Sequence, residues 1–172
     1  MRKLVEFQIL DINAEYYGLD FFELMTNAGA QIAKYIRENI EQTIPVKFIC
    51  GHGNNGGDGF MAAGILKDEG FNVEIYYVKE PKKGTYKKAF ETIKGKIRKI
   101  KKIPDIVDKS VIIVDCLLGS GVVGQPRSPY KEIIGELNQF ENIISVDVPS
   151  GFGTSISVKP LQTITFHARK IG

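Results

Sequence analysis

The sequence lacks the features that mark membrane and secreted proteins and triad hydrolases. No apolar run approaches the roughly 20 residues needed to cross a bilayer, and the densest one, Val111 to Leu118, contains Asp115. Near the start, Glu6 interrupts the apolar stretch before a signal-peptide core can form. With only two cysteines and two histidines, the chain supports neither a disulfide framework nor a Ser-His-Asp triad. These absences favour a cytoplasmic protein with reduced, buried cysteines.

The composition is that of one globular domain. Hydrophobic residues make up 43% and charged residues 25% of 172 residues, which is enough to build a packed core. The chain contains no internal repeat, low-complexity segment or interdomain linker. We therefore expect a single domain over residues 1–172.

The basic residues are concentrated in one segment, Lys79 to Lys102, which we call the basic stripe. It holds eleven Lys and Arg residues against two acids. Such a stripe could bind nucleic acid or nucleotide phosphates. However, apolar residues recur inside it at helical spacing, so the lysines fit the solvated face of a surface helix better, and apart from that apolar face no aromatic residues stand beside the charge for base stacking. These apolar residues are Tyr86, Ala89, Phe90, Ile93 and Ile97.

Short apolar runs alternate with amphipathic segments along the chain. Asp20 can cap the first helix, and its apolar residues then recur every four positions. Strands that are apolar throughout and separated by helices indicate a parallel sheet covered on both faces. The sequence therefore predicts an α/β, doubly wound, Rossmann-like three-layer sandwich with a mostly parallel sheet. The expected strands are 46–50, 73–78, 111–116, 143–148 and 163–166, and the expected helices are 21–40, 59–66, 86–97 and 129–138.

Three segments follow expected strands at the place where such folds bind ligands, beyond the carboxyl ends of the strands. They are Gly51 to Gly59, Asp115 to Gly121, and Asp147 to Gly151. Classic winding places strand 46–50 beside strand 111–116. In that case all three loops face one crevice.

The first loop permits more than one interpretation. Gly51, Gly53 and Gly56 form G-x-G-x-x-G between a strand and a helix, which suggests a nicotinamide-dependent dehydrogenase. That interpretation is weak, because the acid nearest the end of the next strand, Glu74, lies inside the strand. Glycines at a helix N-terminus also suit phosphate binding. Asp58 would repel a phosphate, so it is either a helix cap or a direct ligand contact.

Asp115 and Asp147 both stand at strand ends after apolar residues. A buried carboxylate costs several kcal/mol unless it is paired, hydrogen-bonded or bound to a cation. Each aspartate could simply cap a loop through backbone amides, but two of them opposite Asn55 favour a cation or catalytic site. Ser150 is either a loop hydroxyl or a cation ligand. The available ligand atoms are oxygens, which predicts a hard cation rather than zinc and leaves potassium, sodium, magnesium and calcium open.

These motifs together resemble the NAD(P)HX epimerase family, also called the YjeF N-terminal domain. Gly53 to Gly59 (GNNGGDG) is similar to the family's glycine-rich loop, and Val146 to Gly151 (VDVPSG) is similar to its second hallmark. Asp115 with Gly119 to Gly121 matches the segment between them. Leu24 to Gly29 resembles the N-terminal helix motif, and Thr163 to Phe166 resembles a late strand. The resemblance spans nearly the whole chain.

The resemblance implies an isomerase that interconverts the R and S epimers of hydrated NADH and NADPH in nicotinamide nucleotide repair. It implies that Asp147 is catalytic and that Asn55, Asp115 and Ser150 hold one potassium ion per subunit. It also implies a homodimer and a separate ATP- or ADP-dependent dehydratase as functional partner. The substrate-binding residues it implies are Asn54, Asn55, Gly56, Gly57, Asp58, Gly119, Ser120, Gly121, Val122, Val123, Gly124, Gln125 and Asp147.

The chain also departs from the family pattern. His52 stands where many members have proline, and the acidic DADTG-like stretch is missing after Gly151. The chain ends at Gly172, earlier than its relatives, so it is either a compact member or one that lacks a C-terminal segment.

An alternative function is a non-catalytic scaffold that binds a nucleotide or RNA, because a related domain occurs in mRNA-decapping scaffold proteins and the basic stripe could hold RNA. The intact Asn55, Asp115, Asp147 and Ser150 argue against it and make nucleic-acid binding the less favoured prediction.

Overall fold

A computed structural model of the chain describes residues 2–3, 18, 20–100, 110–166 and 170–171. Its centre is a six-stranded sheet in the order β4-β3-β2-β5-β6-β7, and every neighbouring pair is parallel. The predicted α/β fold with a parallel sheet is thus confirmed. The strands are β2 (Val46–Cys50), β3 (Val73–Tyr77), β4 (Ile97–Lys99), β5 (Ile112–Cys116), β6 (Ile143–Val146) and β7 (Gln162–Ile164).

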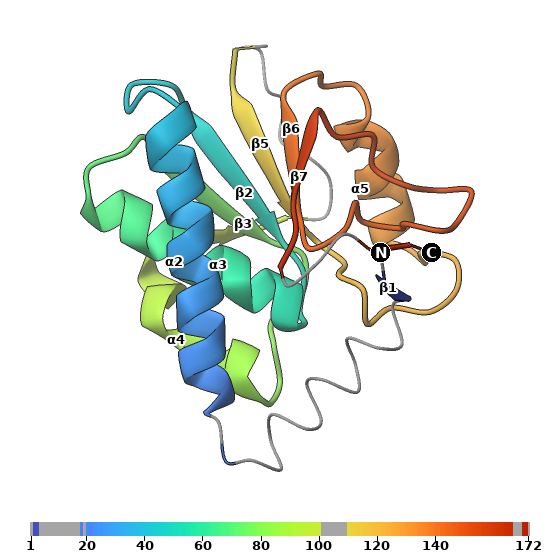
Figure 1. Cartoon of the computed structure of the whole chain (residues 1–172), viewed down its shortest axis with the longest axis horizontal. Helices are drawn as coiled ribbons and strands as arrows, with labels where there is room; N and C mark the ends of the chain where they lie inside the picture. The colour runs from blue at the N-terminus through green and yellow to red at the C-terminus, as the bar shows by residue number, and fades with distance from the viewer. Residues whose placement is uncertain (1, 4–17, 19, 101–109, 167–169, 172) are drawn as a thin grey trace.

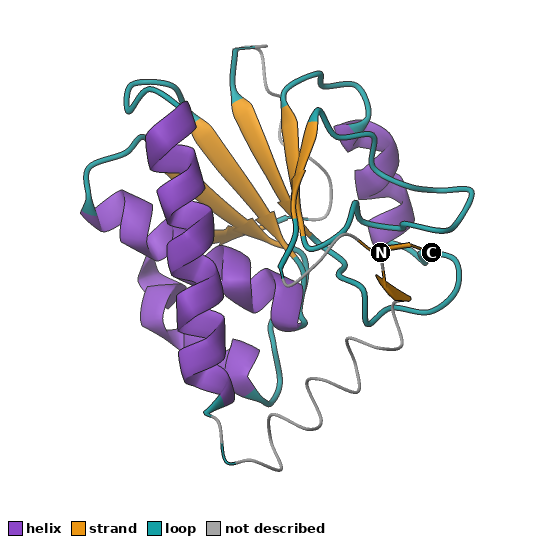
Figure 2. Ribbon diagram, in the orientation of Figure 1, coloured by secondary structure: helices purple, strands orange, loops and turns teal. Residues whose placement is uncertain are grey.

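Helices cover both faces of this sheet. The helices α2 (Phe21–Asn39), α3 (Asn54–Asp68) and α4 (Thr85–Ile93) lie on one face, and α5 (Tyr130–Leu137) lies on the other (Figures 1 and 2). Each face has its own cluster of buried apolar side chains. The three-layer arrangement follows from strands that are apolar on both sides and need cover on both.

Helix α2 forms as its sequence predicts. The carboxylate of Asp20 accepts the Phe22 N–H at 2.8 Å, which satisfies one of the unpaired donors at the helix start. The helix buries one face, including Ile32 and Ile36, and ends at Asn39, followed by the cap residue Ile40, whose backbone is extended. It packs closely on α3, because a β-carbon built on Gly29 would lie 2.5 Å from Cβ of Met61.

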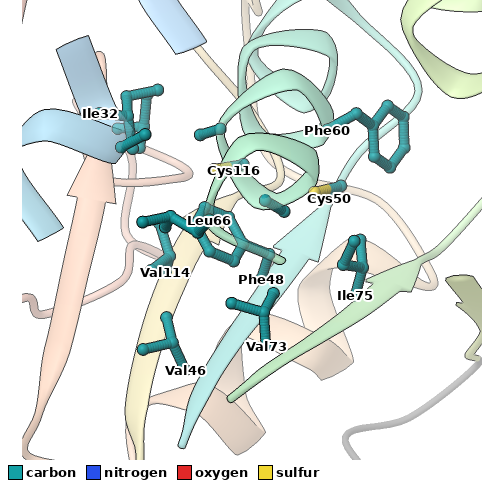
Figure 3. Packing of buried hydrophobic residues seen from close by; sticks show 14 of the residues in the cluster. Ile32, Val46, Phe48, Cys50, Phe60, Leu66, Val73, Ile75, Val114 and Cys116 are labelled. Atoms are coloured by element: carbon teal, nitrogen blue, oxygen red, sulfur yellow. The ribbon is translucent and has the colours of Figure 1, made fainter. Parts of the chain in front are cut away.

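The core lies between α3 and the strands beneath it (Figure 3). Phe48 of β2, Val114 of β5, and Phe60 and Leu66 of α3 are fully buried there. Burying a side chain of this size stabilises the fold by about 1.5–3 kcal/mol, so this layer holds the sheet and helix together. Cys50 and Cys116 are both buried free thiols, as expected.

Two element boundaries differ from the sequence prediction by four residues or more, and the others by at most two. The helix expected over 86–97 ends at Ile93, and after a 3₁₀ turn at Lys94–Lys96 the residue Ile97 begins strand β4, paired with Ile75. The free edge of β3 accepts this strand, and Gly95 weakens any continued helix. Helix α3 begins at Asn54, five residues before the expected start at Gly59, because the glycine-rich segment itself is helical.

The two ends of the described chain form a small separate sheet. Strands β1 (Arg2–Lys3) and β8 (Lys170–Ile171) pair in parallel and do not join the main sheet. Across the part of the chain that the structure describes, no helix is long and apolar enough to cross a membrane.

Candidate functional site

The three predicted loops meet at the carboxyl edge of the sheet, where the winding order reverses. Strand β2 pairs with β5, with Cys50 opposite Cys116, so the chain leaves the two neighbouring strands toward opposite sides of the sheet. A β-carbon built on Gly119 would lie 2.8 Å from Oδ2 of Asp147 and 3.1 Å from Cβ of Asn55. One residue from each loop therefore converges on a single point, as the sequence predicts.

Asp115 is a fully buried carboxylate held by four hydrogen bonds. Its Oδ1 accepts the hydroxyl of Ser150 at 2.6 Å and the Leu117 N–H at 3.2 Å. Its Oδ2 accepts the hydroxyl of Ser145 at 2.8 Å and the Ser150 N–H at 3.0 Å. Burial raises the pKa of Asp115 above its usual value, and these hydrogen bonds oppose that rise. Asp115 thus caps the loops after β5 and β6 through backbone amides, as its position in the sequence suggests.

Asn55 lies in the first turn of α3 with no partner for its side chain. Its Nδ2 and Oδ1 are both buried and make no hydrogen bond within the described structure. A buried amide without partners costs about 1–3 kcal/mol. The side chain of Asn55 is therefore a candidate for binding a polar ligand or an ion.

Asp147 adopts a backbone conformation that few residues tolerate. Its φ is +68°, and among the described residues it is the one non-glycine with positive φ. Its backbone N–H donates to the Ile164 carbonyl at 2.8 Å, and its Oδ2 accepts the Ser120 N–H at 2.6 Å. Such strain costs about 1–3 kcal/mol and persists where the surroundings fix it, which is typical of functional positions.

The glycines of the first loop serve packing more than ligand access. A β-carbon on Gly51 would lie 1.9 Å from the Leu117 carbonyl oxygen, one on Gly56 2.2 Å from the Gly51 oxygen, and one on Gly57 2.5 Å from the Met25 sulfur. Gly53, in contrast, has nothing within 4 Å of that position. The side of the loop that is open to a ligand is therefore at Gly53, beside the exposed Asn54.

Asp58 is not a helix cap, which corrects one of the two roles expected for it. The cap position is Gly53, so Asp58 is the fifth residue of α3, and the first turn contains no acidic residue. Its half-buried carboxylate lies close enough to Cys116 to contribute to the raised pKa of that thiol, after burial, Cys50 and Asp115.

The oxygen atoms around Asp115 suit a hard cation. Asn55 offers an unpartnered buried oxygen, and Ser150 contacts both the carboxylate and the Leu118 carbonyl, at 3.3 Å. Across the described residues no Lys or Arg pairs with Asp115, so hydrogen bonds and no positive side chain stabilise its charge. Among the described residues no group of three His, Cys, Asp or Glu side chains is placed to hold a metal ion, so the donor set does not suit zinc. The oxygen donors of Asn55, Asp115 and Ser150 thus suit the predicted hard cation in chemical type.

The loop over 119–125 forms the outer rim of the site. Val122 is 48% and Val123 92% exposed, and Gln125 accepts the Ser155 hydroxyl at 3.2 Å. Gly121 and Gly124 have nothing within 4 Å of a built β-carbon. A hollow of about 10 Å³ lies beneath the rim, which is far too small for a nicotinamide ring. It is lined by Gly119, Ser120, Val122, Gly124, Val148, Gly151, Phe152 and Thr154.

Two contacts at the site escaped the sequence analysis. Ser145 is fully buried and bonds Asp115, its partner in the register of β5 and β6. A serine inside an otherwise apolar strand was the available signal, because a buried hydroxyl needs a partner. His52 forms a hydrogen bond through Nδ1 to the hydroxyl of Tyr130, and no sequence signal joins two residues so far apart.

The fold and site define a class before any comparison is made. A parallel sheet in this order, with a glycine-rich helix start and two carboxylates at its switch point, is typical of α/β proteins that bind nucleotides. The family model for the YjeF-related protein N-terminus matches residues 22–172. The chain belongs to this family.

Named relatives agree with the family. The chain is 37% identical over 174 residues to the bifunctional NAD(P)H-hydrate repair enzyme Nnr of Archaeoglobus fulgidus, covering 97% of this chain. It is 39% identical over 146 residues, or 82% of this chain, to an NAD(P)H-hydrate epimerase of Plasmodium vivax. A crystal structure of yeast ynu0, YNL200c, matches with a TM-score of 0.78 at 26% identity, covering 96% of this chain and 80% of that one.

The chain is shorter than these sequence relatives. It spans 37% of the length of the Archaeoglobus protein and 50% of the Plasmodium vivax protein.

Proposed function

We propose that this protein is an epimerase that interconverts the R and S epimers of hydrated NADH and NADPH. The observation that carries the proposal is the convergence of Asn55, Gly119 and Asp147 at the switch point of the sheet. The names of its relatives, an NAD(P)H-hydrate epimerase and a bifunctional NAD(P)H-hydrate repair enzyme, support the same activity.

Asp147 is the group that we assign to the chemistry. Inversion at the hydroxyl-bearing carbon of the hydrated ring requires transient loss of the hydroxyl or opening of the ring, and charge develops on the ring in either case. A carboxylate held in place by the Ser120 N–H can move the proton or stabilise that charge. The strained backbone of Asp147 fixes the direction of its side chain toward Gly119 and Asn55.

The start of α3 is suited to the phosphates of the dinucleotide. First-turn N–H groups of a helix have no acceptor within the helix and attract anions. Gly53 leaves room for a phosphate to approach, and Asn54 is exposed beside it. The loop over 119–125 would contact the nicotinamide side of the substrate. The hollow beneath this loop is too small for the nicotinamide ring. Either the loop shifts when the substrate binds, or the nicotinamide ring binds along the outer side of the loop.

A potassium ion is part of the proposal. Asn55, Asp115 and Ser150 would hold it, and its charge would compensate the buried carboxylate and nearby phosphate groups. The site residues would then be ordered before the substrate binds.

The activity test uses one purified epimer of hydrated NADPH. The wild-type protein is expected to convert it to the mixture of epimers, followed by chromatography, at least 100-fold faster than the uncatalysed control, as positioned proton transfer provides. Asp147→Asn should abolish turnover and retain substrate binding, since it keeps the shape and removes the charge. Turnover by the variant at the wild-type rate would exclude Asp147 from the chemistry, and no conversion by the wild type would exclude the epimerase.

The cation is tested by thermal unfolding as well as by activity. Potassium chloride should raise the unfolding temperature more than the same concentration of tetramethylammonium chloride, because an ion that binds only the folded state stabilises it. Asn55→Ala should remove that difference. Equal unfolding temperatures in the two salts for the wild-type protein would contradict a cation site.

The oligomeric state, the location in the cell and the functional partner are also part of the proposal. We infer a homodimer, a cytoplasmic location and a functional partner that removes water from one epimer in an ATP- or ADP-dependent reaction. Bifunctional names among the relatives support a coupling of two repair activities.

A further inference from the structure

The carboxyl end of β3 carries a basic residue at the position that selects between the two nicotinamide dinucleotides. In folds with this strand order, the residue after the second strand faces the adenosine ribose; an acid binds a free 2′-hydroxyl, and a basic residue accommodates a 2′-phosphate. Here the second strand of the main sheet, in chain order, is β3, and Lys79 lies two residues beyond its end at Tyr77.

His52 lies at the equivalent position after the neighbouring strand. Strands β2 and β3 are in register with Cys50 opposite Tyr77, and the pairing extends to a hydrogen bond from the Val78 N–H to the Cys50 carbonyl, at 3.1 Å. His52 and Lys79 therefore each lie two residues beyond the last pair of opposite residues, Cys50 and Tyr77. The Lys79 ammonium also contributes, after burial, to lowering the pKa of His52, so the two side chains interact.

Tyr130 holds the imidazole of His52 in place. The two rings are stacked with centroids 5.7 Å apart, and the Tyr130 hydroxyl bonds Nδ1 of His52. Burial raises the pKa of Tyr130 to about 12, so the phenol keeps its proton and can donate it to Nδ1. We assign the remaining imidazole proton to Nε2 on this basis, which makes that atom a hydrogen-bond donor.

The acids that could hold a free 2′-hydroxyl are engaged elsewhere. Glu74 pairs with Lys47 at 3.2 Å and also bonds the hydroxyl of Tyr76. Glu80 pairs with Lys94 at 3.6 Å. Among the described residues around this end of β3, both acids are therefore paired with lysines, and the basic side chain of Lys79 is not paired with either of them.

We propose that Lys79 and His52 form the binding site for the 2′-phosphate of hydrated NADPH, so that the enzyme favours hydrated NADPH over hydrated NADH. This inference rests on the proposed function for its substrate. It places the hydrated ring at Asp147 after β6, the pyrophosphate at the start of α3, and the adenosine ribose beside Lys79, in a line along the carboxyl edge of the sheet.

The experiment measures the full chain by calorimetry with two fragments, adenosine 2′,5′-bisphosphate and 5′-AMP. The bisphosphate should bind at least about tenfold more tightly, since a charge-assisted contact to phosphate contributes on the order of 1.4 kcal/mol. Lys79→Ala should lose most of this preference and leave 5′-AMP binding nearly unchanged. His52→Phe keeps a ring against Tyr130 and should lose part of the preference.

Lys159→Ala is the matched control, because it removes the same charge. Lys159 is exposed and lies near the amino edge of the sheet, since its N–H bonds Asn138 just after α5 and Leu161 bonds the first residue of β6. This variant should keep the wild-type preference. Equal affinities for the two fragments, no binding of the bisphosphate at millimolar concentration, or a preference that survives in Lys79→Ala would each overturn the proposal.

Steady-state kinetics separates this proposal from the function on which it rests. The KM for hydrated NADPH should be about tenfold lower than that for hydrated NADH, and the two values should approach each other in Lys79→Ala with kcat unchanged. Equal KM values for hydrated NADPH and hydrated NADH in an active enzyme would contradict the 2′-phosphate site but not the epimerase proposal. An inactive enzyme that still prefers the bisphosphate would defeat the epimerase proposal alone.

Discussion

Gly119 is the residue on which the geometry of the site depends most directly. Its missing side chain leaves the space between Asp147 and Asn55, and a β-carbon there would lie 2.8 Å from Oδ2 of the aspartate. Gly119→Ala should therefore displace that carboxylate. A displacement of about 1 Å at a reacting group can cost about 100-fold in rate, so kcat should fall by about that factor. Epimerisation kinetics on the purified variant provides the measurement.

Gly121→Ala is the control at this scale. Gly121 lies in the same loop, and nothing stands within 4 Å of a β-carbon built on it. This variant should retain kcat within a few-fold of the wild type. If the two alanine variants lose activity equally, loop flexibility rather than the position of Asp147 limits the reaction.

At the scale of elements, helix α3 can lie close to β2 and β5 because Gly59 faces the two thiols beneath it. A β-carbon on Gly59 would lie 2.7 Å from the sulfur of Cys116 and 2.9 Å from that of Cys50 (Figure 3 shows both cysteines). Overpacking of this kind costs about 1–3 kcal/mol. Gly59→Ala should lower the free energy of unfolding by that amount, although alanine is the better helix former. Urea unfolding measures the change.

The matched substitution in another helix should change the free energy of unfolding in the opposite direction. Gly135 lies within α5, and a β-carbon there would meet nothing within 4 Å. Gly135→Ala should raise the free energy of unfolding by about 1 kcal/mol through helix propensity alone. A stabilising effect of both substitutions would show that α3 can move away from the sheet without loss.

For the whole molecule, the buried Tyr76 and the half-buried Tyr130 predict a loss of stability at alkaline pH. Burial raises the pKa of both Tyr76 and Tyr130 from 10.0 to about 12, and the hydrogen bond to Glu74 adds to the effect for Tyr76. Between pH 10 and pH 12 the unfolded chain loses protons that the folded protein keeps. The free energy of unfolding should therefore fall as pH rises through this range.

Urea unfolding at several pH values from 9 to about 12 tests this decline. Tyr76→Phe and Tyr130→Phe should each make it shallower, because phenylalanine does not ionise. Phenolate absorbance can be followed at the same time, since the chain has no tryptophan. An identical decline in both variants and the wild type would assign it to other groups.

The basic stripe shows how far a charge pattern can be interpreted from sequence. The apolar residues inside it do form a buried helix face, at Ala89, Phe90 and Ile93 of α4, and Lys94 pairs with Glu80 and Glu91. The solvated-face interpretation is confirmed for α4. The sequence pattern did not show that Ile97 belongs to an edge strand, because one residue in a helical period does not reveal a neighbouring strand with a free edge.

The sequence by itself determined most elements of the main sheet and its helices, and where the polar loops follow the strands. Apolar runs of strand length, helical spacing and the position of Asp115 and Asp147 at strand ends are local properties, and they were sufficient to predict a parallel sheet with oxygen-rich loops at one edge. Asp20 as the cap of α2 is equally local.

Only the tertiary structure decided which side chains face one another. The orphaned amide of Asn55, the strained φ of Asp147, the Ser145 bond to Asp115 and the stacking of His52 on Tyr130 join residues from different elements. Such contacts depend on strand register and helix placement, which are set by the packing of the whole core rather than by any segment of the chain.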